Sequence, residues 1–389
     1  MKFDGKKCLS ATITDIKPSG IRKFFDLLDD MKDVVALTVG QPDFVTPWHI
    51  RDAGIRSLEE GRTYYTSNNG LLEFRREISA YQKRRFGLEY DPATEIIVTV
   101  GGSEAIDLAM RALVNPGDEV IIPEPCFVCY EPLARLAGAV PVTIELRAED
   151  GFKLTAEQLK NAITDKTKLL VLPFPNNPTG SCLRKDDLES LAKVLEDTNV
   201  CVLSDEIYSE LTYGEKHISI ANIEGMRERT IVVNGFSKAY AMTGWRLGYT
   251  LAPAYFTKQM AKVHQFGIMC APTTSQYAAI EALKHGDSDI EEMKAEYEAR
   301  RRLIVSELNR IGIETFMPDG AFYVFADIRK FGLASDEFCE RLLSEQHCAI
   351  VPGSAFGKSG EGFARLSYAY SPAHITKAAK RIEAFIKTL

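Results

Sequence analysis

The chain has 389 residues, of which 45% are hydrophobic and 26% charged, with 27 glycines and 17 prolines. This composition is typical of a globular protein and excludes collagen-like and disordered chains, and the length favours two domains. Lysine and arginine total 47 against 54 aspartates and glutamates, so the net charge of −7 argues against general binding to nucleic acid or to an anionic membrane.

Targeting features are missing from the sequence as given. No apolar run approaches the roughly 20 residues that a membrane-spanning helix needs. Residues Met1–Thr12 contain three lysines but no apolar segment behind them, so no secretory signal is visible. The eight cysteines are scattered, which favours a reducing compartment over a disulfide framework. We therefore expect a cytoplasmic protein.

Short apolar runs alternate with helical patterns through the middle of the chain. Most of these runs are β-branched and apolar at both odd and even positions, as in strands buried on both faces. They predict a mostly parallel sheet with helices on both sides, a three-layer α/β/α domain. The predicted strands are Glu95–Val100, Glu119–Ile122, Lys168–Leu172, Val200–Leu203, Thr230–Val233 and Leu247–Ala252.

The pattern changes after about residue 280. Apolar residues from Ile290 to Leu308 fall at helical spacing and predict one long amphipathic helix. Strands are then predicted at Ala321–Ala326, Ala349–Val351 and Phe363–Tyr368, before a final helix that runs to Leu389. This indicates a smaller α+β domain, which the segment Gly20–Leu37 is expected to join. The predicted divisions are 1–45 (N-terminal arm and first part of the small domain), 46–280 (large domain) and 281–389 (small domain).

The first motif that could carry chemistry is Gly101-Gly102-Ser103-Glu104-Ala105, which follows a predicted strand and opens a helix. Unpaired N–H groups, the positive end of the helix dipole and the Ser103 hydroxyl together predict an anion site, suited to phosphate. The alternative is an ordinary helix start capped by Ser103. The G-x-G-x-x-G pattern of dinucleotide-binding proteins is absent.

Two further motifs follow the next predicted strands. Pro175-Asn176-Asn177-Pro178-Thr179-Gly180 fixes a turn at a strand's carboxyl end, where ligands bind in open α/β sheets. Asp205-Glu206-Ile207-Tyr208 places a carboxylate at the same edge. The alternatives are a plain Asn-Pro turn and a helix N-cap at Asp205.

The fourth motif is Asn234-Gly235-Phe236-Ser237-Lys238, followed by Met242-Thr243-Gly244-Trp245-Arg246. A lysine here would sit at the mouth of the sheet, partly removed from water. Such a lysine can lose its proton near neutral pH and act as a nucleophile or as a Schiff-base partner. A solvated surface lysine is the alternative.

Taken in this order, the four motifs resemble those of the class I pyridoxal-phosphate aminotransferases, which have fold type I. The resemblance covers nearly the whole chain, from Ser19–Phe24 and Val39–Phe44 to Arg365–Ser367. The Ser-Lys pair followed by Met-Thr-Gly-Trp-Arg is highly specific. The sequence looks closest to bacterial aspartate, aromatic and N-acetyl-diaminopimelate aminotransferases.

The resemblance implies a catalytic role for three residues. Lys238 would form the Schiff base with pyridoxal 5'-phosphate and, once released, move the proton between the substrate's α-carbon and the cofactor. Asp205 would face the pyridine nitrogen and keep it protonated. Tyr208 would hydrogen-bond the cofactor's phenolic oxygen together with Asn177.

The resemblance also implies the remaining cofactor and substrate contacts. The residues that would bind the cofactor's phosphate or ring are Gly102, Ser103, Glu104 (through its backbone amide), Arg246, Phe127 (stacked on the ring) and Tyr65 (reaching the phosphate of the neighbouring subunit). Arg365 would hold the substrate α-carboxylate, beside Asn177 and the backbone of Gly40. Some family members have a second phosphate-binding hydroxyl three residues before the lysine. That position is Gly235 here, and Ser237 directly precedes Lys238, so Ser237 is not counted among the phosphate ligands.

Other features have plain interpretations. Cys126-Phe127-Val128-Cys129 lacks the second ligand pair of a structural zinc site, so we expect both thiols to pack around Phe127 and no metal to bind. The charge run Glu298–Arg302 is expected to be a solvated helix face.

The sequence thus predicts a pyridoxal-phosphate aminotransferase acting as a homodimer with a shared active site. One substrate pair would be 2-oxoglutarate and glutamate, and the donor aspartate, an aromatic amino acid or N-acetyl-diaminopimelate. One alternative is a C–S β-lyase or decarboxylase with the same cofactor, but the related lyases usually alter the Asn-Pro-Thr-Gly turn, which is intact here. The other is a non-enzymatic regulator, which would carry a DNA-binding domain ahead of the pattern that begins at Ser19.

Overall fold

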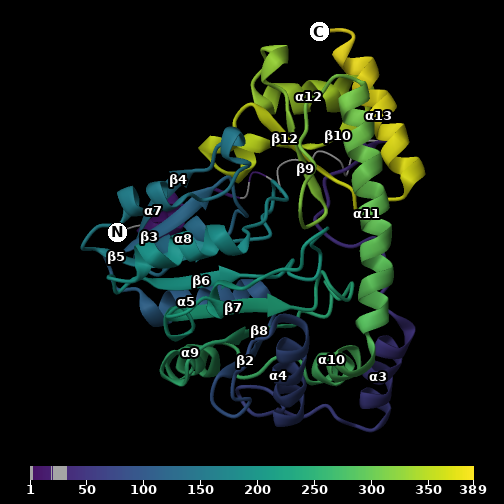
Figure 1. Cartoon of the computed structure of the whole chain (residues 1–389). Helices are drawn as coiled ribbons and strands as arrows, with labels where there is room; N and C mark the ends of the chain where they lie inside the picture. Colours follow the sequence, from purple (N-terminus) through teal and green to yellow (C-terminus); the bar gives the residue numbers. More distant parts are fainter. Residues whose placement is uncertain (1–2, 19, 21–32) are drawn as a thin grey trace.

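The computed structural model describes residues 3–18, 20 and 33–389. Two bodies are stacked in Figure 1, a larger one built around a sheet and a smaller one above it. The long helix α11 (Asp287–Arg310) runs along one side of the molecule from the larger body to the smaller one. Helix α10 (Thr273–His285) lies at its foot.

The large body contains a seven-stranded sheet in the order β2-β8-β7-β6-β5-β3-β4. Its strands are β2 (Ile96–Thr99), β3 (Glu119–Glu124), β4 (Val140–Glu145), β5 (Thr167–Leu172), β6 (Cys201–Asp205), β7 (Thr230–Gly235) and β8 (Gly248–Leu251). Of these seven, β8 alone runs in the opposite direction to the other six, which confirms the prediction of a mostly parallel sheet. Strand β4 was not predicted, because it lies at the edge and its outer residues are exposed.

Helices cover both faces of this sheet, as the three-layer prediction requires. In β5, Leu169 and Val171 face the layer that contains α5, whereas Leu170 and Leu172 face the layer that contains α7 and α8. Each of these four side chains is almost completely buried, which stabilises the fold by roughly 1.5–3 kcal/mol per residue. The helices of this body are α3 (Trp48–Glu59), α4 (Leu72–Phe86), α5 (Gly102–Leu113), α6 (Tyr130–Leu136), α7 (Ala156–Ala162), α8 (Lys185–Leu195) and α9 (Ala254–Gly267).

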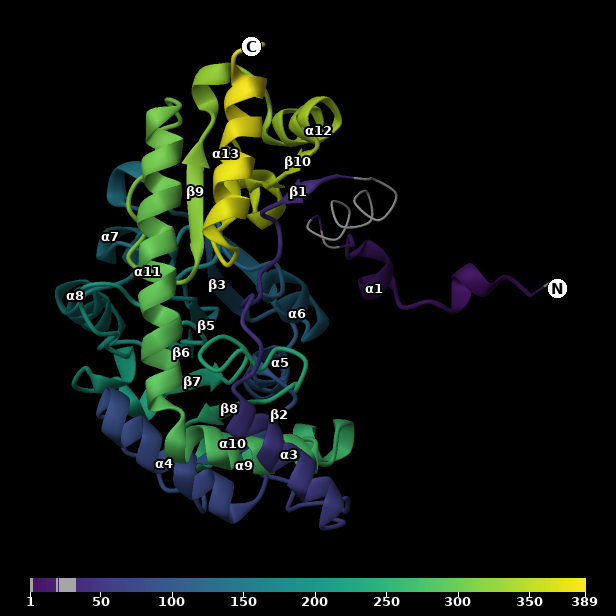
Figure 2. The ribbon, with the colours of Figure 1, turned by 90° about the vertical axis from the view of Figure 1, so that its right-hand side faces the viewer.

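The small body is built from both ends of the chain. A three-stranded antiparallel sheet has the order β11-β12-β9, and a two-stranded parallel sheet pairs β1 with β10. Its elements are β1 (Val35–Ala36), β9 (Tyr323–Asp327), α12 (Ser335–Gln346), β10 (Cys348–Ala349), β11 (Val351–Pro352), β12 (Phe363–Ser367) and α13 (Pro372–Ile386). Figure 2 shows β1 lying beside β10. Residues 21–32 of the segment expected to join this domain lie outside the described part.

The single strand predicted at Ala349–Val351 is wrong, because the structure divides it into β10 and β11. Ala349 pairs with Ala36 in one sheet, and Val351 pairs with Arg365 in the other. The change of partner occurs at the buried Ile350. A continuous apolar run in the sequence cannot show that its two halves have different partners.

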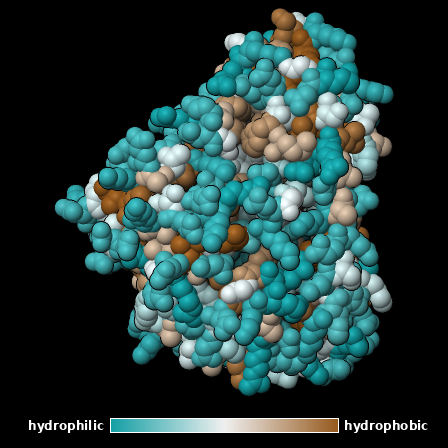
Figure 3. All heavy atoms as spheres, in the orientation of Figure 1, coloured by the Kyte–Doolittle hydropathy of each residue, from teal (hydrophilic) through white to brown (hydrophobic). Residues whose placement is uncertain are grey.

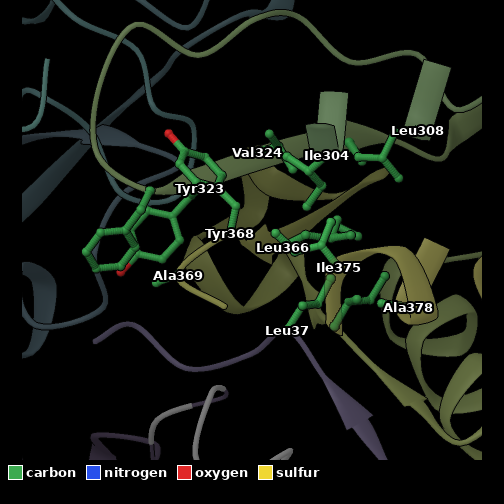
Figure 4. Close-up of a cluster of buried hydrophobic side chains, with 14 of the residues drawn as sticks. Leu37, Ile304, Leu308, Tyr323, Val324, Leu366, Tyr368, Ala369, Ile375 and Ala378 are labelled. Atoms are coloured by element: carbon green, nitrogen blue, oxygen red, sulfur yellow. The ribbon is translucent and has the colours of Figure 1, made fainter. Parts of the chain in front are cut away.

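The core of the small body gathers side chains from distant parts of the sequence (Figure 4). Leu37, Ile304, Leu366 and Ile375 pack together there, from the β1 segment, α11, β12 and α13. At the other end of α11, Ile290 packs into the core of the large body. Helix α11 therefore belongs to both cores, and the division at residues 280 and 281 stays a prediction.

The surface shown in Figure 3 is mostly hydrophilic, with apolar residues in small groups. At the N-terminus, the residues before the short helix α1 (Ala11–Asp15) extend away from the body (Figure 2). No helix among the described residues is long and apolar enough to cross a membrane.

Candidate active site

A cavity of about 400 Å³ lies at the carboxyl ends of the parallel strands, closed on one side by the small body. All the predicted site residues except Glu104 and Tyr65 line it. They are Gly40, Gly102, Ser103, Phe127, Asn177, Asp205, Tyr208, Lys238, Arg246 and Arg365. Ser237, which the sequence analysis did not count, lines it as well. The four motifs therefore meet in one place.

Lys238 follows β7 and directs its amine into this cavity. Its Nζ donates a hydrogen bond to the backbone oxygen of Gly40 at 2.5 Å. Burial lowers the pKa of Lys238, and repulsion by Arg365 and Arg246 lowers it further against the attraction of Asp205, so that the pKa is about 8. A useful fraction of the amine is therefore unprotonated near neutral pH and can attack a carbonyl carbon.

Asp205 ends β6 with its carboxylate buried in the cavity wall. Its Oδ2 accepts a hydrogen bond from the Tyr130 hydroxyl at 2.8 Å, and its Oδ1 accepts one from the Ile207 N–H at 3.2 Å. Burial raises the pKa of Asp205, while these hydrogen bonds and the charge of Lys238 oppose the rise. A buried carboxylate of this kind suits a cationic ring nitrogen. No helix follows, so the N-cap alternative does not hold.

The glycine turn before α5 approaches other backbone closely. Gly101 has a φ of +83°, and a Cβ added there would lie 2.8 Å from Nη2 of Arg246. A Cβ added at Gly248 would lie 2.7 Å from the carbonyl carbon of Gly101. The N-cap of α5 is Gly101 rather than Ser103, so the Ser103 hydroxyl does not cap this helix. A helix start, a hydroxyl and a guanidinium therefore converge as the predicted anion site requires.

The Glu104 side chain supports this turn from the side away from the cavity. Its Oε1 is hydrogen-bonded to Nδ1 of the buried His264 at 2.6 Å, and its Oε2 accepts the N–H of Val100. Its carboxylate is therefore engaged outside the cavity, and only its backbone N–H is available at the helix start.

Arg365 projects from β12 and is only 2% exposed. Its Nη1 donates to Oδ1 of Asn177 at 2.9 Å, and its Nη2 donates to the backbone oxygen of Thr38 at 2.6 Å. Its guanidinium lies over the Tyr323 ring, 4.5 Å from the ring centre. It forms no ion pair with a carboxylate of the described residues. The N–H groups that remain can bind a carboxylate from the cavity.

Tyr323 and Tyr130 were missed by the sequence analysis. The hydroxyls of Tyr323 and Tyr208 are hydrogen-bonded at 2.9 Å, and burial raises the pKa of Tyr208 well above its ordinary value. A Cβ added at Gly40 would lie 2.7 Å from the Tyr323 hydroxyl. The sequence pattern of an aromatic residue in a strand or a helix is that of a core residue, so no sequence signal distinguished these two tyrosines from residues of the hydrophobic core.

Two expectations outside the cavity can be compared with the structure. Burial raises the pKa of both Cys126 and Cys129, and the described residues contain no group of three or more His, Cys, Asp or Glu that could hold a metal. The expectation that Glu298–Arg302 is a solvated face is wrong for two of its arginines, because Arg300 and Arg301 are only 7% and 8% exposed. They pack between α11 and the loops that face it.

A three-layer fold with a small second body, and with its lysine in a cavity at the strand ends, is that of the fold type I aminotransferases. The model of the family "Aminotransferase class I and II" matches residues 32–382, and the chain belongs to this family. The activity of this protein is the transfer of an amino group between an amino acid and a 2-oxo acid.

Individual relatives match along nearly their whole length. The chain is 52% identical to "Putative aminotransferase YugH" of Bacillus subtilis, with 97% of this chain and 98% of the relative covered. It is 45% identical to "Probable N-acetyl-LL-diaminopimelate aminotransferase" of the same organism, over 97% of this chain and 95% of the relative. The structure of an aromatic aminotransferase from Pyrococcus horikoshii superposes with a TM-score of 0.90 at 44% identity, covering 94% of this chain and 99% of that one.

Proposed function

We propose that this aminotransferase holds pyridoxal 5'-phosphate on Lys238 and uses glutamate and 2-oxoglutarate as one of its substrate pairs. The observation that carries the proposal is the position of Lys238, whose pKa is lowered to about 8 in a cavity that also contains an anion site and a buried carboxylate. The chemistry of these three groups matches the aldehyde, the phosphate and the ring nitrogen of that cofactor.

The residues present fit the cofactor on geometric grounds. A Cβ at Gly101 or Gly248 would intrude on the turn that opens α5, so these glycines let the backbone amides and Arg246 surround a phosphate. Asp205, held by Tyr130, would pair with the ring nitrogen, and Phe127 would pack on the ring. When bound, the cofactor withdraws electrons from the substrate's α-carbon. Lys238 would then move the proton at that carbon.

Arg365 would orient both substrates, because an amino acid and a 2-oxo acid each carry a carboxylate next to the reacting carbon. The hydrogen bonds to Asn177 and Thr38 fix the guanidinium, so its remaining N–H groups are directed before the substrate arrives. The donors that follow from the resemblance and from the names of the relatives are aspartate, aromatic amino acids and N-acetyl-diaminopimelate. A panel of these donors with 2-oxoglutarate as acceptor identifies the preferred one.

We further propose that the enzyme is a cytoplasmic homodimer with a shared site. Tyr65 is 77% exposed. The loop that carries it lies beside the segment that contains Met269, because Asn68 donates a hydrogen bond to the backbone oxygen of Met269 at 2.8 Å. Phe266 in that segment is 86% exposed. Large apolar side chains exposed on two adjoining segments favour a protein partner. A second copy of the chain would cover them and receive Tyr65 at its phosphate site.

Covalent attachment of the cofactor tests the central claim. The protein loaded with pyridoxal phosphate should absorb in the visible range, and borohydride reduction should fix the cofactor to Lys238 in a peptide map. Lys238→Ala is the matched control and should bind the cofactor without fixing it. An adduct on another lysine would contradict the proposal. Pyruvate release from cysteine conjugates at a rate above amino transfer would favour the C–S β-lyase instead.

Mixing two poorly active variants tests the shared site. A heterodimer of Tyr65→Phe and Lys238→Ala subunits would carry both changes in one site and neither in the other. Activity should therefore recover on mixing. Heterodimers that form without any recovery would refute the shared site.

A further inference from the structure

The segment Thr38–Thr46, called the strap below, crosses from the small body to the large one between β1 and α3 (Figure 2). Two of its backbone carbonyls accept hydrogen bonds from charged side chains of the cavity. The oxygen of Thr38 accepts a hydrogen bond from Arg365 at 2.6 Å, and the oxygen of Gly40 accepts one from Lys238 at 2.5 Å. The position of the strap therefore sets where both side chains are anchored.

The strap is fastened to α11 by one buried arginine. Nη1 of Arg300 donates to Oδ1 of Asp43 at 2.7 Å, and the guanidinium lies 5.0 Å from the centre of the Phe44 ring. That ring in turn meets Tyr297 of α11 edge to face, with the ring centres 5.3 Å apart. At the far end, the Thr46 hydroxyl donates to the backbone oxygen of Ala241 at 2.7 Å.

The Arg300–Asp43 pair does more to fix geometry than to stabilise the fold. The Arg300 side chain is 8% exposed and that of Asp43 is 29% exposed, so the pair loses hydration that its attraction only partly returns. A guanidinium can donate a charged hydrogen bond and stack its flat face on an aromatic ring at the same time. Arg300 can therefore bind the Asp43 carboxylate and the Phe44 ring together. Arg300 does not line the cavity and touches neither Lys238 nor Arg365.

We propose that Arg300 is a positioning residue, which holds Asp43 and Phe44 against α11 and thereby keeps the carbonyls of Thr38 and Gly40 in place. The proposal rests on the proposed function in one respect, because it assumes that Arg365 binds the substrate carboxylate. A loosened strap leaves the Arg365 guanidinium less fixed. Both substrates should then bind more weakly, while the phosphate site at the start of α5, where Gly102 and Ser103 form no hydrogen bond with the strap, keeps its affinity.

The test compares Arg300→Met and Asp43→Asn with the control Arg302→Met, which lies on the same helix and is well exposed. In the loaded enzyme, both test variants should raise KM for donor and for acceptor by about tenfold, the cost of one charge-assisted hydrogen bond. The Kd of pyridoxal phosphate should stay within about twofold of the wild-type value, as expected for a site without changed contacts. The control should match the wild type throughout.

Amide hydrogen exchange gives a second readout that does not depend on activity. In the cofactor-free protein, residues 38–46 should exchange faster in both test variants than in the wild type or the control. Unchanged exchange in the strap would overturn the proposal, whatever the donor proves to be. A lowered Tm with unchanged KM values would also overturn it, because the pair would then serve stability alone.

The double variant separates a joint action from two separate ones. If Arg300 acts through Asp43, then Arg300→Met combined with Asp43→Asn should raise KM hardly more than Arg300→Met alone. A KM increase in the double variant equal to the product of the two single increases would overturn the proposal. Should Arg300→Met fail to fold, Asp43→Asn still decides the question, because it keeps Arg300 in place. A wild-type enzyme that transfers no amino group would contradict the proposed function, and the exchange experiment would still decide for or against the strap.

Discussion

Replacing Arg365 by lysine should lower kcat/KM for the amino donor and for the 2-oxo acid together. In the wild type, two N–H groups of Arg365 are used by Asn177 and Thr38, and those that remain can hold a carboxylate by two parallel bonds. Lysine cannot supply both the internal bonds and the pair to the substrate. The loss of charge-assisted bonds in a buried site should cost about 2–4 kcal/mol, which lowers kcat/KM about 30- to 1000-fold.

The assay is steady-state kinetics in both directions, with the absorbance of the bound cofactor followed in parallel. The absorbance should not change, because the phosphate and ring contacts lie elsewhere in the cavity. Arg329→Lys is the matched control, since Arg329 lies in the same body and pairs with Asp327 at the surface. A variant that affected only one of the two substrates would refute the assignment. Equal reaction of amines that lack a carboxylate would refute it as well.

Three further outcomes are expected. In the cofactor-free protein, labelling of Lys238 by an amine reagent should rise with a midpoint near pH 8, and a midpoint near 10.5, the ordinary lysine value, would contradict the burial argument. Asp205→Ala should keep the cofactor but lower kcat at least about 100-fold, the usual cost of removing one electrostatic stabiliser of a transition state, and near-normal turnover would refute the role. Burial lowers the pKa of His49, but hydrogen bonds to Asp289 and Glu281 outweigh this and raise it above 6.5. The Tm difference between wild type and His49→Gln should therefore be largest below pH 6.5 and fall as pH rises through the raised pKa, and a difference that is constant with pH would exclude this.

The strands and the motifs at their ends were predictable because both depend on local sequence. In a run such as Lys168–Leu172, the residues that face the helices on either side of the sheet are apolar, so the strand can be recognised from the sequence. A parallel sheet brings the carboxyl ends of such strands to one edge. The glycine turn before Ser103 and the lysine at 238 could therefore be placed in one site before any contact was known.

The missed features depend on contacts between segments far apart in the sequence. Arg300 lies in a charge run that is typical of a solvated helix face. Its helix runs from one body to the other, however, and the strap packs on Arg300. Tyr323 has the pattern of a core residue, and only the approach of Tyr208 from the large body gives its hydroxyl a place in the cavity. Periodicity describes one element at a time, so it cannot show what packs on the outside of that element.

The pairing of β1 with β10 has a consequence for the order of events during synthesis. Val35 pairs with Cys348, and the two are 348 − 35 = 313 residues apart. At the usual rates of translation, the ribosome needs about 15–60 s to make that stretch. The sheet of the large body can form in that interval, but β1 has no partner until the end. Arg365, which would bind the substrate carboxylate, is made later still, so the newborn chain should acquire the residues of its cofactor site before it can recognise a substrate.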